Sequence, residues 1–184
     1  MNLLVFICAI VGGVITYLST PWMIRYLKRI GLVVKDQNKE NKPLVPISGG
    51  LAVFSGFFIG IMFFIFFRTF FDGGSYSLEL DNNNLVFLFA GFISILLVTL
   101  IGFLDDVLIN KTKDESSGLR QWQKPMLTLI AAVPLMVVNA GTSVMNLPLI
   151  GDVKLGALYP LILVPIGFVG AANMVNMLAG FNGL

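Results

Sequence analysis

Apolar runs long enough to cross a lipid bilayer recur along this chain, and they constrain its fold more than any other feature. They lie at about residues 2–24, 49–71, 85–108, 125–140 and 158–178. A helix needs about 20 residues to cross roughly 30 Å of hydrocarbon. Hydrophobic residues make up 57% of the chain and charged residues only 12%, which favours the bilayer as the solvent. We therefore predict an all-α polytopic membrane protein with about five transmembrane helices.

The chain has the features of a single membrane domain that covers residues 1–184. It has no internal repeat, and the loops between the apolar runs are too short for a second soluble domain. The first run is expected to be a retained helix rather than a secretory signal, because no basic residue precedes it and Gly12 and Gly13 interrupt it. Since the last run is followed at once by Asn182, Gly183 and Leu184, we expect a truncation at the C terminus.

A short β-hairpin is predicted between the last two apolar runs, on the external side of the membrane. Residues 144–150 and 153–155 flank Gly151 and Asp152, a dipeptide that suits a tight two-residue turn. Pro148 would restrict its strand to a sheet edge.

Cysteine and histidine are scarce, which excludes several kinds of chemistry. Cys8 is the one cysteine, and the chain has no histidine. An intramolecular disulfide and a thiolate metal cluster are therefore excluded. Acid–base catalysis by histidine is excluded within these residues for the same reason.

The distribution of positive charge predicts the orientation in the membrane. Lys and Arg outnumber Asp and Glu in the loops after the first and third runs, and cytoplasmic loops carry this excess. The basic residues are Arg25, Lys28, Arg29, Lys35, Lys39 and Lys42 in the first loop, and Lys111, Lys113, Arg120 and Lys124 in the second. We predict that the N terminus is outside, that both loops are cytoplasmic, and that the fifth run ends on the cytoplasmic side.

The first of three polar motifs is the basic loop before the second run. It reads Lys39-Glu-Asn-Lys42-Pro43-Leu-Val-Pro46-Ile-Ser48-Gly49-Gly50. Backbone N–H groups at a helix start, with lysines nearby, can hold phosphate oxygens. This favours a substrate-binding role for Lys42, Ser48 and Gly49. The alternative is a solvated loop that only obeys the positive-inside rule.

The second motif is Gly102-Phe-Leu-Asp105-Asp106, where two adjacent carboxylates terminate an apolar span. Ionisable groups at membrane depth are costly and usually functional, and the helix dipole disfavours aspartate at a C terminus. Adjacent helical side chains point about 100° apart, so we expect the two aspartates to divide roles rather than chelate one ion. Alternatively, the pair marks the membrane interface and binds Lys111 or Lys113.

The third motif is Asn173-Met-Val-Asn176-Met-Leu-Ala179-Gly180-Phe-Asn182-Gly183-Leu184. Asn173 and Asn176 share a helix face, and amide oxygens can ligate a hard cation. We expect Asn173 to bind substrate, and Gly180 permits close approach of a ligand to the backbone. The alternative is that the amides form hydrogen bonds between membrane helices. The predicted topology brings all three motifs to one membrane face.

These motifs resemble the polyprenyl-phosphate N-acetylhexosamine-1-phosphate transferases, of the glycosyltransferase family 4 type. The resemblance rests on Pro46-Ile-Ser-Gly49-Gly50, on Gly102-Phe-Leu-Asp105-Asp106-Val-Leu and on the run from Asn173 to Leu184, in the same order and spacing. It covers nearly the whole chain. It implies the N-terminal half of a fold with roughly ten transmembrane helices.

The resemblance also implies roles for individual residues. Asn176 matches the family's magnesium-contacting asparagine, and Gly180 and Asn182 match the segment that contacts uridine. Asp105 and Asp106 match the paired aspartates beside the lipid-phosphate site, which we expect to be catalytic. Lys124 matches a lysine expected near phosphate, and Lys42 matches only approximately. The family's third acidic metal ligand and its sugar-contacting loop have no counterpart in this chain, so we expect these 184 residues alone to transfer nothing.

The implied reaction transfers a sugar-1-phosphate, most simply GlcNAc-1-phosphate, from a UDP-sugar to a polyprenyl or dolichyl phosphate and releases UMP. Mg²⁺ is the implied cofactor, and Mn²⁺ could replace it. Ala179 and Asn182 stand where bacterial members usually have aspartate, and this resembles the eukaryotic dolichyl-phosphate branch and its archaeal relatives. We expect a prokaryotic, archaeal plasma membrane, or the ER membrane if the source is eukaryotic, with the active face in the cytoplasm.

The sequence is also compatible with three other functions. A bacterial-type phospho-MurNAc-pentapeptide or undecaprenyl-phosphate transferase would use the same motifs with another donor. A transporter would place polar residues near the middle of the membrane, whereas here they cluster at helix ends. An inactive fragment that serves as an assembly partner is a further reading. The expected partners are a UDP-sugar, a lipid phosphate and the membrane, with no nucleic acid, and a homodimer is compatible with them.

Overall fold

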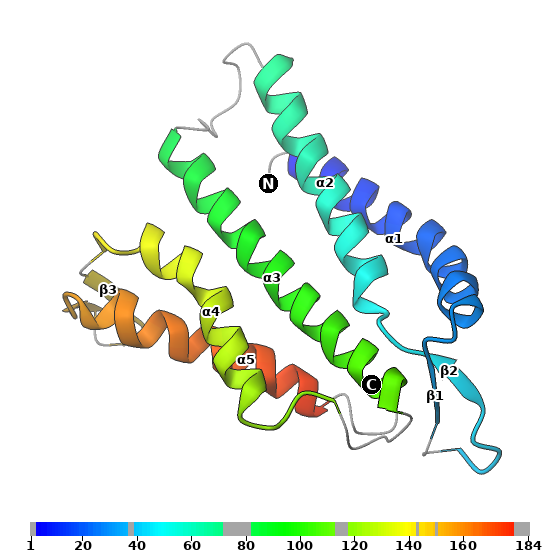
Figure 1. Ribbon diagram of the computed structural model, residues 1–184. Helices are drawn as coiled ribbons and strands as arrows, with labels where there is room; N and C mark the ends of the chain where they lie inside the picture. Colours follow the sequence, from blue (N-terminus) through cyan, green and yellow to red (C-terminus); the bar gives the residue numbers. More distant parts are fainter. Residues whose placement is uncertain are drawn as a thin grey trace. The chain divides into compact units, whose positions relative to one another are not determined.

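The computed structural model describes residues 3–36, 39–71, 82–112, 118–142, 144–149 and 151–178. Helices dominate it, as Figure 1 shows. They are α1 (Leu3–Arg29), α2 (Gly50–Phe70), α3 (Asn82–Thr112), α4 (Gln123–Val138) and α5 (Val164–Leu178), and a π-helical turn, η1 (Tyr159–Leu163), leads into α5. The strands are β1 (Val33–Lys35), β2 (Leu44–Pro46), β3 (Val144–Leu147) and β4 (Gly151–Lys154).

Three of the described helices are long and apolar enough to cross a membrane. They are Leu3–Arg29, Gly50–Phe70 and Asn83–Ile109, while Gln123–Val138 and Tyr159–Met174 are shorter apolar helices. At 1.5 Å per residue, the 16 residues of α4 extend about 24 Å, which is less than the roughly 30 Å of hydrocarbon. The predicted fold class is confirmed, and the chain is an integral membrane protein.

The fold divides into two compact units, and each is described by itself. Unit 1 contains Met1–Leu80 and Gly102–Gly118, and unit 2 contains Asp81–Ile101 and Leu119–Leu184. The boundary lies within α3, whose first part belongs to unit 2 and whose last part belongs to unit 1. One membrane domain over residues 1–184 stays a prediction.

Unit 1 is built on close packing between α1 and α2, which lie side by side in Figure 1. A Cβ atom added to Gly12 would lie 3.0 Å from the carbonyl oxygen of Gly56, and one added to Gly60 would lie 3.1 Å from the carbonyl oxygen of Cys8. Because residues 8 and 60 and residues 12 and 56 are opposite each other, the two helices run antiparallel. Small residues four apart allow such an approach between membrane helices, where van der Waals packing provides the attraction.

The end of α1 is fixed by a turn around Gly31, which has a φ of +76°. The N–H of Leu32 donates to the carbonyl of Leu27 (2.9 Å), and the N–H of Gly31 donates to the carbonyl of Lys28 (3.2 Å). This hydrogen-bond pair is a Schellman motif, in which a glycine adopts the left-handed conformation after the last helical turn. Leu27 and Leu32 are buried, as the hydrophobic contact of that motif requires.

A strand pair that the sequence did not predict follows this turn. β1 and β2 pair antiparallel, with Val33 opposite Pro46 and Lys35 opposite Leu44. Three-residue strands are too short to produce a visible alternation of apolar and polar residues. The loop before the second apolar run is therefore a structured hairpin that positions Ser48.

Unit 2 contains α4, α5 and the predicted hairpin between them. β3 pairs with β4, with Val144 opposite Lys154 and Leu147 opposite Gly151. The hairpin is confirmed, but the predicted turn at Gly151 and Asp152 is wrong, because both residues belong to β4. The chain reverses between Leu147 and Gly151, where Leu149 (φ +75°) and Gly151 (φ +85°) have left-handed backbones and Pro148 constrains its own φ.

Candidate functional site

A hydrogen bond joins the first two polar motifs in unit 1. The Ser48 hydroxyl donates to Oδ2 of Asp106 at 2.7 Å, across 58 residues of sequence. Ser48 follows β2 and precedes α2, while Asp106 lies in α3, and both side chains are half-buried. Hydrogen bonds to a carboxylate are stronger than those between neutral groups. The motif before α2 and the aspartate pair therefore belong to one local site.

The backbone of Ser48 is in the left-handed region, with a φ of +65°. This conformation costs a residue with a Cβ atom about 1–3 kcal/mol, and the surrounding structure must impose it. The N–H of Ile47 donates to the carbonyl of Leu32 (3.2 Å), and the carbonyl of Ser48 accepts from the N–H of Leu51 (3.2 Å). These bonds hold the backbone on both sides of Ser48 and so direct its hydroxyl toward Asp106.

Asp105 has different neighbours from Asp106. Its side chain is only 8% exposed. Gly118 lies so close that a Cβ atom there would overlap Oδ1 of Asp105 and would also lie 2.9 Å from Cγ1 of Ile109. The two carboxylates, about 100° apart on the helix, thus have different neighbours, and a division of roles between them stays a prediction. A glycine at position 118 therefore makes room for the buried carboxylate.

The sequence suggested that the aspartate pair lies at the end of its helix, and this is wrong. α3 continues to Thr112, more than one turn past Asp106. The influence of the helix dipole falls off within the last turn, so the argument that the dipole disfavours aspartate at this place does not apply. The contacts with Ser48 and Gly118 give each carboxylate a defined place instead.

Lys42 and Gly49 lie at the two ends of the segment that contains β2. Lys42 is exposed in the turn between β1 and β2, with a φ of +40°, and Gly49 is the N-cap residue of α2. The N–H groups of Leu51 and Ala52 already donate to the carbonyls of Ser48 and Gly49. In the described part of unit 1, the N–H groups of Gly49 and Gly50 are therefore the remaining candidates to meet a phosphate at this helix start.

In unit 2, Asn173 forms a hydrogen bond between helices. Its Nδ2 donates to the hydroxyl of Thr128 (3.1 Å) and to the carbonyl of Val169 (2.8 Å). The Thr128 hydroxyl donates in turn to the carbonyl of Lys124 (2.9 Å). Both amide hydrogens of Asn173 are used in these bonds. The amide nitrogen therefore has the role that the alternative hypothesis gave it, a hydrogen bond between membrane helices. Only its oxygen could meet a ligand, and substrate binding by Asn173 stays a prediction.

The remaining predicted residues are less completely described. Lys124 lies in the first turn of α4 and is half-buried. Asn176 lies one turn after Asn173 in α5, and its side chain is outside the described residues, as are Gly180 and Asn182. Sequence reasoning missed Gly118 and Thr128: an isolated glycine in a polar loop and a threonine in an apolar helix carry no distinctive signal.

No ready-made cluster of acidic metal ligands is found in the part of the chain that the structure describes, since no three His, Cys, Asp or Glu side chains group together there. Mg²⁺ is usually held by one or two carboxylates together with substrate phosphates and water. The carboxylate oxygens of Asp105 and Asp106 have the chemistry that this ion prefers. Magnesium binding stays a prediction.

Comparison with known proteins gives a consistent assignment. The family model described as glycosyl transferase family 4 matches residues 88–184. A protein of Saccharolobus solfataricus is 33% identical over 92% of this chain and 46% of its own length. One of Sulfolobus acidocaldarius is 33% identical over 98% of this chain and 49% of its own length. Both are provisionally named UDP-N-acetylglucosamine–dolichyl-phosphate N-acetylglucosaminephosphotransferase.

A bacterial relative is also similar. The phospho-N-acetylmuramoyl-pentapeptide-transferase of Lactiplantibacillus plantarum is 29% identical over 100% of this chain and 56% of its own length. The chain thus spans about half the length of the curated relatives it matches. The family model covers more than half of the chain and includes the second and third motifs, so the chain belongs to glycosyl transferase family 4.

Proposed function

We propose that the protein containing this chain transfers GlcNAc-1-phosphate from UDP-GlcNAc to a polyprenyl or dolichyl phosphate and releases UMP. The observation that carries this proposal is the bond between Ser48 and Asp106, which joins the basic, glycine-rich segment before α2 to the aspartate pair. In a site of this kind, backbone N–H groups and lysine side chains can bind phosphate oxygens, and the carboxylates beside them are held in place. The archaeal relatives, whose names specify this reaction, support the same assignment.

In the proposed reaction, an oxygen of the lipid phosphate attacks the β-phosphorus of the UDP-sugar. A new P–O bond forms there, the bond between the β-phosphorus and the bridging oxygen breaks, and UMP leaves with that oxygen. Catalysis of phosphoryl transfer is mainly positioning and electrostatic stabilisation. We propose that Asp106, which Ser48 orients, and Asp105, which is held in a buried position, define where the lipid phosphate and the diphosphate sit.

Charge imposes a further requirement on this site. A carboxylate about 4 Å from a phosphate is repelled by about 4 kcal/mol at an effective dielectric constant near 20, so positive groups must compensate. We propose that Lys42 and Lys124 bind phosphate oxygens and that Gly180 and Asn182 contact the nucleotide. Asn176 and an aspartate would hold Mg²⁺, which when bound would neutralise the charge of the diphosphate.

We further propose that the face with Ser48 and Asp106 is cytoplasmic. The basic residues of the α1 end and the β1–β2 hairpin support this orientation, because cytoplasmic loops are rich in Lys and Arg. They belong to the same unit as the bond between Ser48 and Asp106.

Donor choice is the first experiment. Membranes that contain the protein are incubated with polyprenyl phosphate, Mg²⁺ and either labelled UDP-GlcNAc or labelled UDP-MurNAc-pentapeptide. We expect lipid-linked label from UDP-GlcNAc and little from the pentapeptide donor. The similarity to bacterial phospho-N-acetylmuramoyl-pentapeptide-transferases makes that donor the main competitor, and preference for it would overturn the donor assignment.

Substitution of the proposed site residues is the second experiment. Asp105→Asn, Asp106→Asn and Asn176→Ala should each lower transfer at least roughly 10²-fold, the scale of losing one positioned contact in a transition state. Asp152→Asn is the matched control, because this exposed carboxylate lies in the β3–β4 hairpin and pairs with Asn146. Near-normal turnover in all three site variants, at normal membrane levels, would leave the aspartates and Asn176 with structural roles only.

A further inference from the structure

The last turns of α1 carry an aromatic and positively charged surface that the proposed reaction does not use. It consists of Trp22, Arg25, Tyr26 and Arg29, which we call the aromatic–arginine face. At 100° per residue, these four positions fall within about 100° of the helix circumference. All four side chains are exposed. Leu27, which is 2% exposed and packs into unit 1, lies on the opposite side of the helix.

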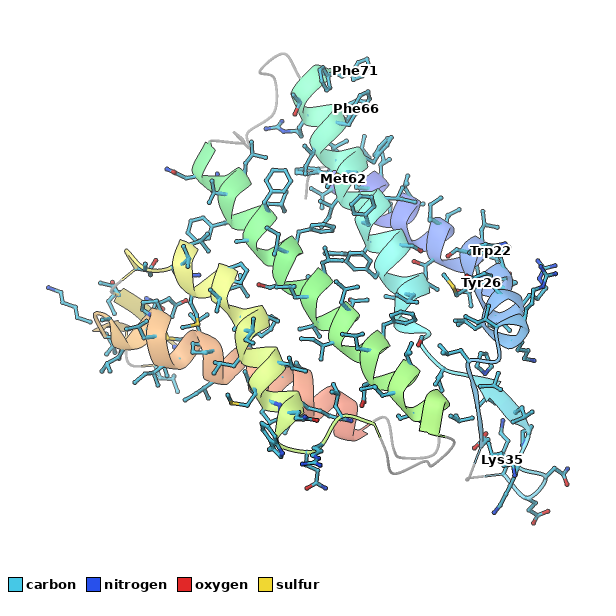
Figure 2. The ribbon with its side chains drawn as sticks, in the orientation of Figure 1. Trp22, Tyr26, Lys35, Met62, Phe66 and Phe71 are labelled. Atoms are coloured by element: carbon cyan, nitrogen blue, oxygen red, sulfur yellow. The ribbon has the colours of Figure 1, made fainter. Side chains whose placement is uncertain are left out.

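The two aromatic rings form an ordered pair. Trp22 and Tyr26 stack with their ring centroids 5.6 Å apart and an interplanar angle of 11°. They remain 57% and 47% exposed, respectively. Figure 2 shows both on successive turns of α1, with Lys35 on the hairpin that follows. Trp and Tyr are enriched where a membrane helix passes through the headgroup layer, because one end of each ring system is apolar and the other is polar.

The arginines are placed to meet an anion beside these rings. Nε of Arg25 donates to the carbonyl of Pro21 at 3.3 Å, which holds the guanidinium along the helix and leaves its terminal nitrogens for another partner. Arg29 lies one turn later on the same face. Guanidinium groups bind phosphate oxygens in a bidentate manner. Two such groups, one turn apart, suit a phosphodiester.

The neighbouring charges reinforce this positive surface. Lys28, Lys35 and Lys42 are exposed at the end of α1 and on the β1–β2 hairpin. Of the nearby carboxylates, Asp36 lies 3.4 Å from Lys39, so this pair is partly neutralised, and Glu40 is in the hairpin turn. Between residues 25 and 42 the chain therefore carries six basic and two acidic residues, a net charge of 6 − 2 = +4.

We propose that the aromatic–arginine face binds the phosphate headgroup of an anionic phospholipid from the surrounding leaflet. The face lies at the end of a helix that is apolar enough to cross the membrane, so its side chains meet lipid headgroups rather than bulk solvent. Clusters of Lys and Arg next to a transmembrane helix attract anionic lipids, at about 1 kcal/mol per basic residue. The stacked rings hold this end of α1 at the depth where the phosphates lie. The proposal is independent of the transfer reaction.

The test measures lipid retention directly. The chain is purified in detergent and titrated with phosphatidylglycerol or with phosphatidylcholine of the same acyl chains, and native mass spectrometry counts the lipids that stay bound. We expect phosphatidylglycerol to bind more tightly. Arg25→Gln with Arg29→Gln should weaken phosphatidylglycerol binding about 25-fold, which corresponds to about fivefold for each charge. Phosphatidylcholine has the same phosphodiester, but its choline offsets the negative charge, so its weaker binding should fall by a smaller factor.

Control variants distinguish lipid binding at this face from a general attraction of anionic lipids to any positive charge on the protein. Lys154→Gln removes one exposed charge from β4 and should leave phosphatidylglycerol retention unchanged. Circular dichroism of the double arginine variant checks that it is folded, as expected for exposed positions. Equal binding of both lipids, or equal losses in the double variant and Lys154→Gln, would overturn the proposal. Retention of polyprenyl phosphate but not of phosphatidylglycerol at this face would also overturn it, because the surface would then serve the substrate lipid.

Discussion

Ser48→Ala removes one hydroxyl and leaves the backbone of the candidate site in place, which makes it a sensitive test of the local geometry. The bond that is lost is 2.7 Å long, is half-buried and ends on a carboxylate. Hydrogen bonds to charged groups contribute about 1.5–3 kcal/mol, and Asp106 would lose one of its donors. We expect the free energy of unfolding to fall by this amount.

Ser48→Gly removes the same hydroxyl but also relieves the backbone at φ +65°. A left-handed conformation costs residues with a Cβ atom about 1–2 kcal/mol, which glycine avoids. Ser48→Gly should therefore be more stable than Ser48→Ala by about 1 kcal/mol. Transfer should fall by a similar factor in both variants, roughly tenfold or more, because neither can orient Asp106.

The assay is unfolding in detergent micelles, followed by circular dichroism, together with the transfer rate of each variant. Ser55→Ala is the matched control in α2, because its hydroxyl donates only to the carbonyl of Ala52, three residues earlier in the same helix (2.8 Å). It should change stability by less than about 0.5 kcal/mol. Wild-type stability of Ser48→Ala, or a glycine variant less stable than the alanine variant, would refute the reasoning.

Three other outcomes follow from the structure. Gly56→Ala should destabilise unit 1 by about 1–3 kcal/mol in the same unfolding assay, because its Cβ would lie 2.5 Å from the carbonyl oxygen of Gly12 and overlap Thr16. As a control, Gly13→Ala should be neutral or stabilising, because its Cβ meets no atom within 4 Å. Asn173→Ala should destabilise unit 2 by roughly 0.6–1.7 kcal/mol, from the average to the maximum measured for hydrogen bonds between membrane helices, and no change in melting would contradict the interhelical role. A cysteine at the exposed position Lys42 should react with thiol reagents only from the cytoplasm and one at Lys154 only from outside, so the reverse pattern would invert the topology.

The helical framework was predictable because a membrane helix corresponds to one continuous apolar run in the sequence. Each apolar run became a helix near its expected position, and the hairpin between the last two was found as well. The predicted end of the first run, residue 24, was too early. α1 continues to Arg29, since Arg and Lys are good helix formers whose heads extend to the membrane interface.

The candidate site was predictable only as a set of motifs. The contact between Ser48 and Asp106 joins residues 58 positions apart, and no local pattern encodes such a pairing. The left-handed backbone at Ser48 was equally hidden, because serine is not a residue that signals this conformation. The close fit of Gly118 against Asp105 depends on side-chain packing, which a sequence pattern does not show. The meeting of all three motifs on one membrane face stays a prediction.

The nucleotide product tests the central claim most directly. Membranes that contain the protein are incubated with polyprenyl phosphate, Mg²⁺ and UDP-GlcNAc labelled at the β-phosphorus, and the lipid and nucleotide fractions are separated. Transfer of a sugar-1-phosphate predicts that the label moves into the lipid fraction and that unlabelled UMP is released in equal amount, with the Asp106→Asn variant producing neither. Release of labelled UDP with an unlabelled lipid-linked sugar would show transfer of the sugar alone and would contradict the account.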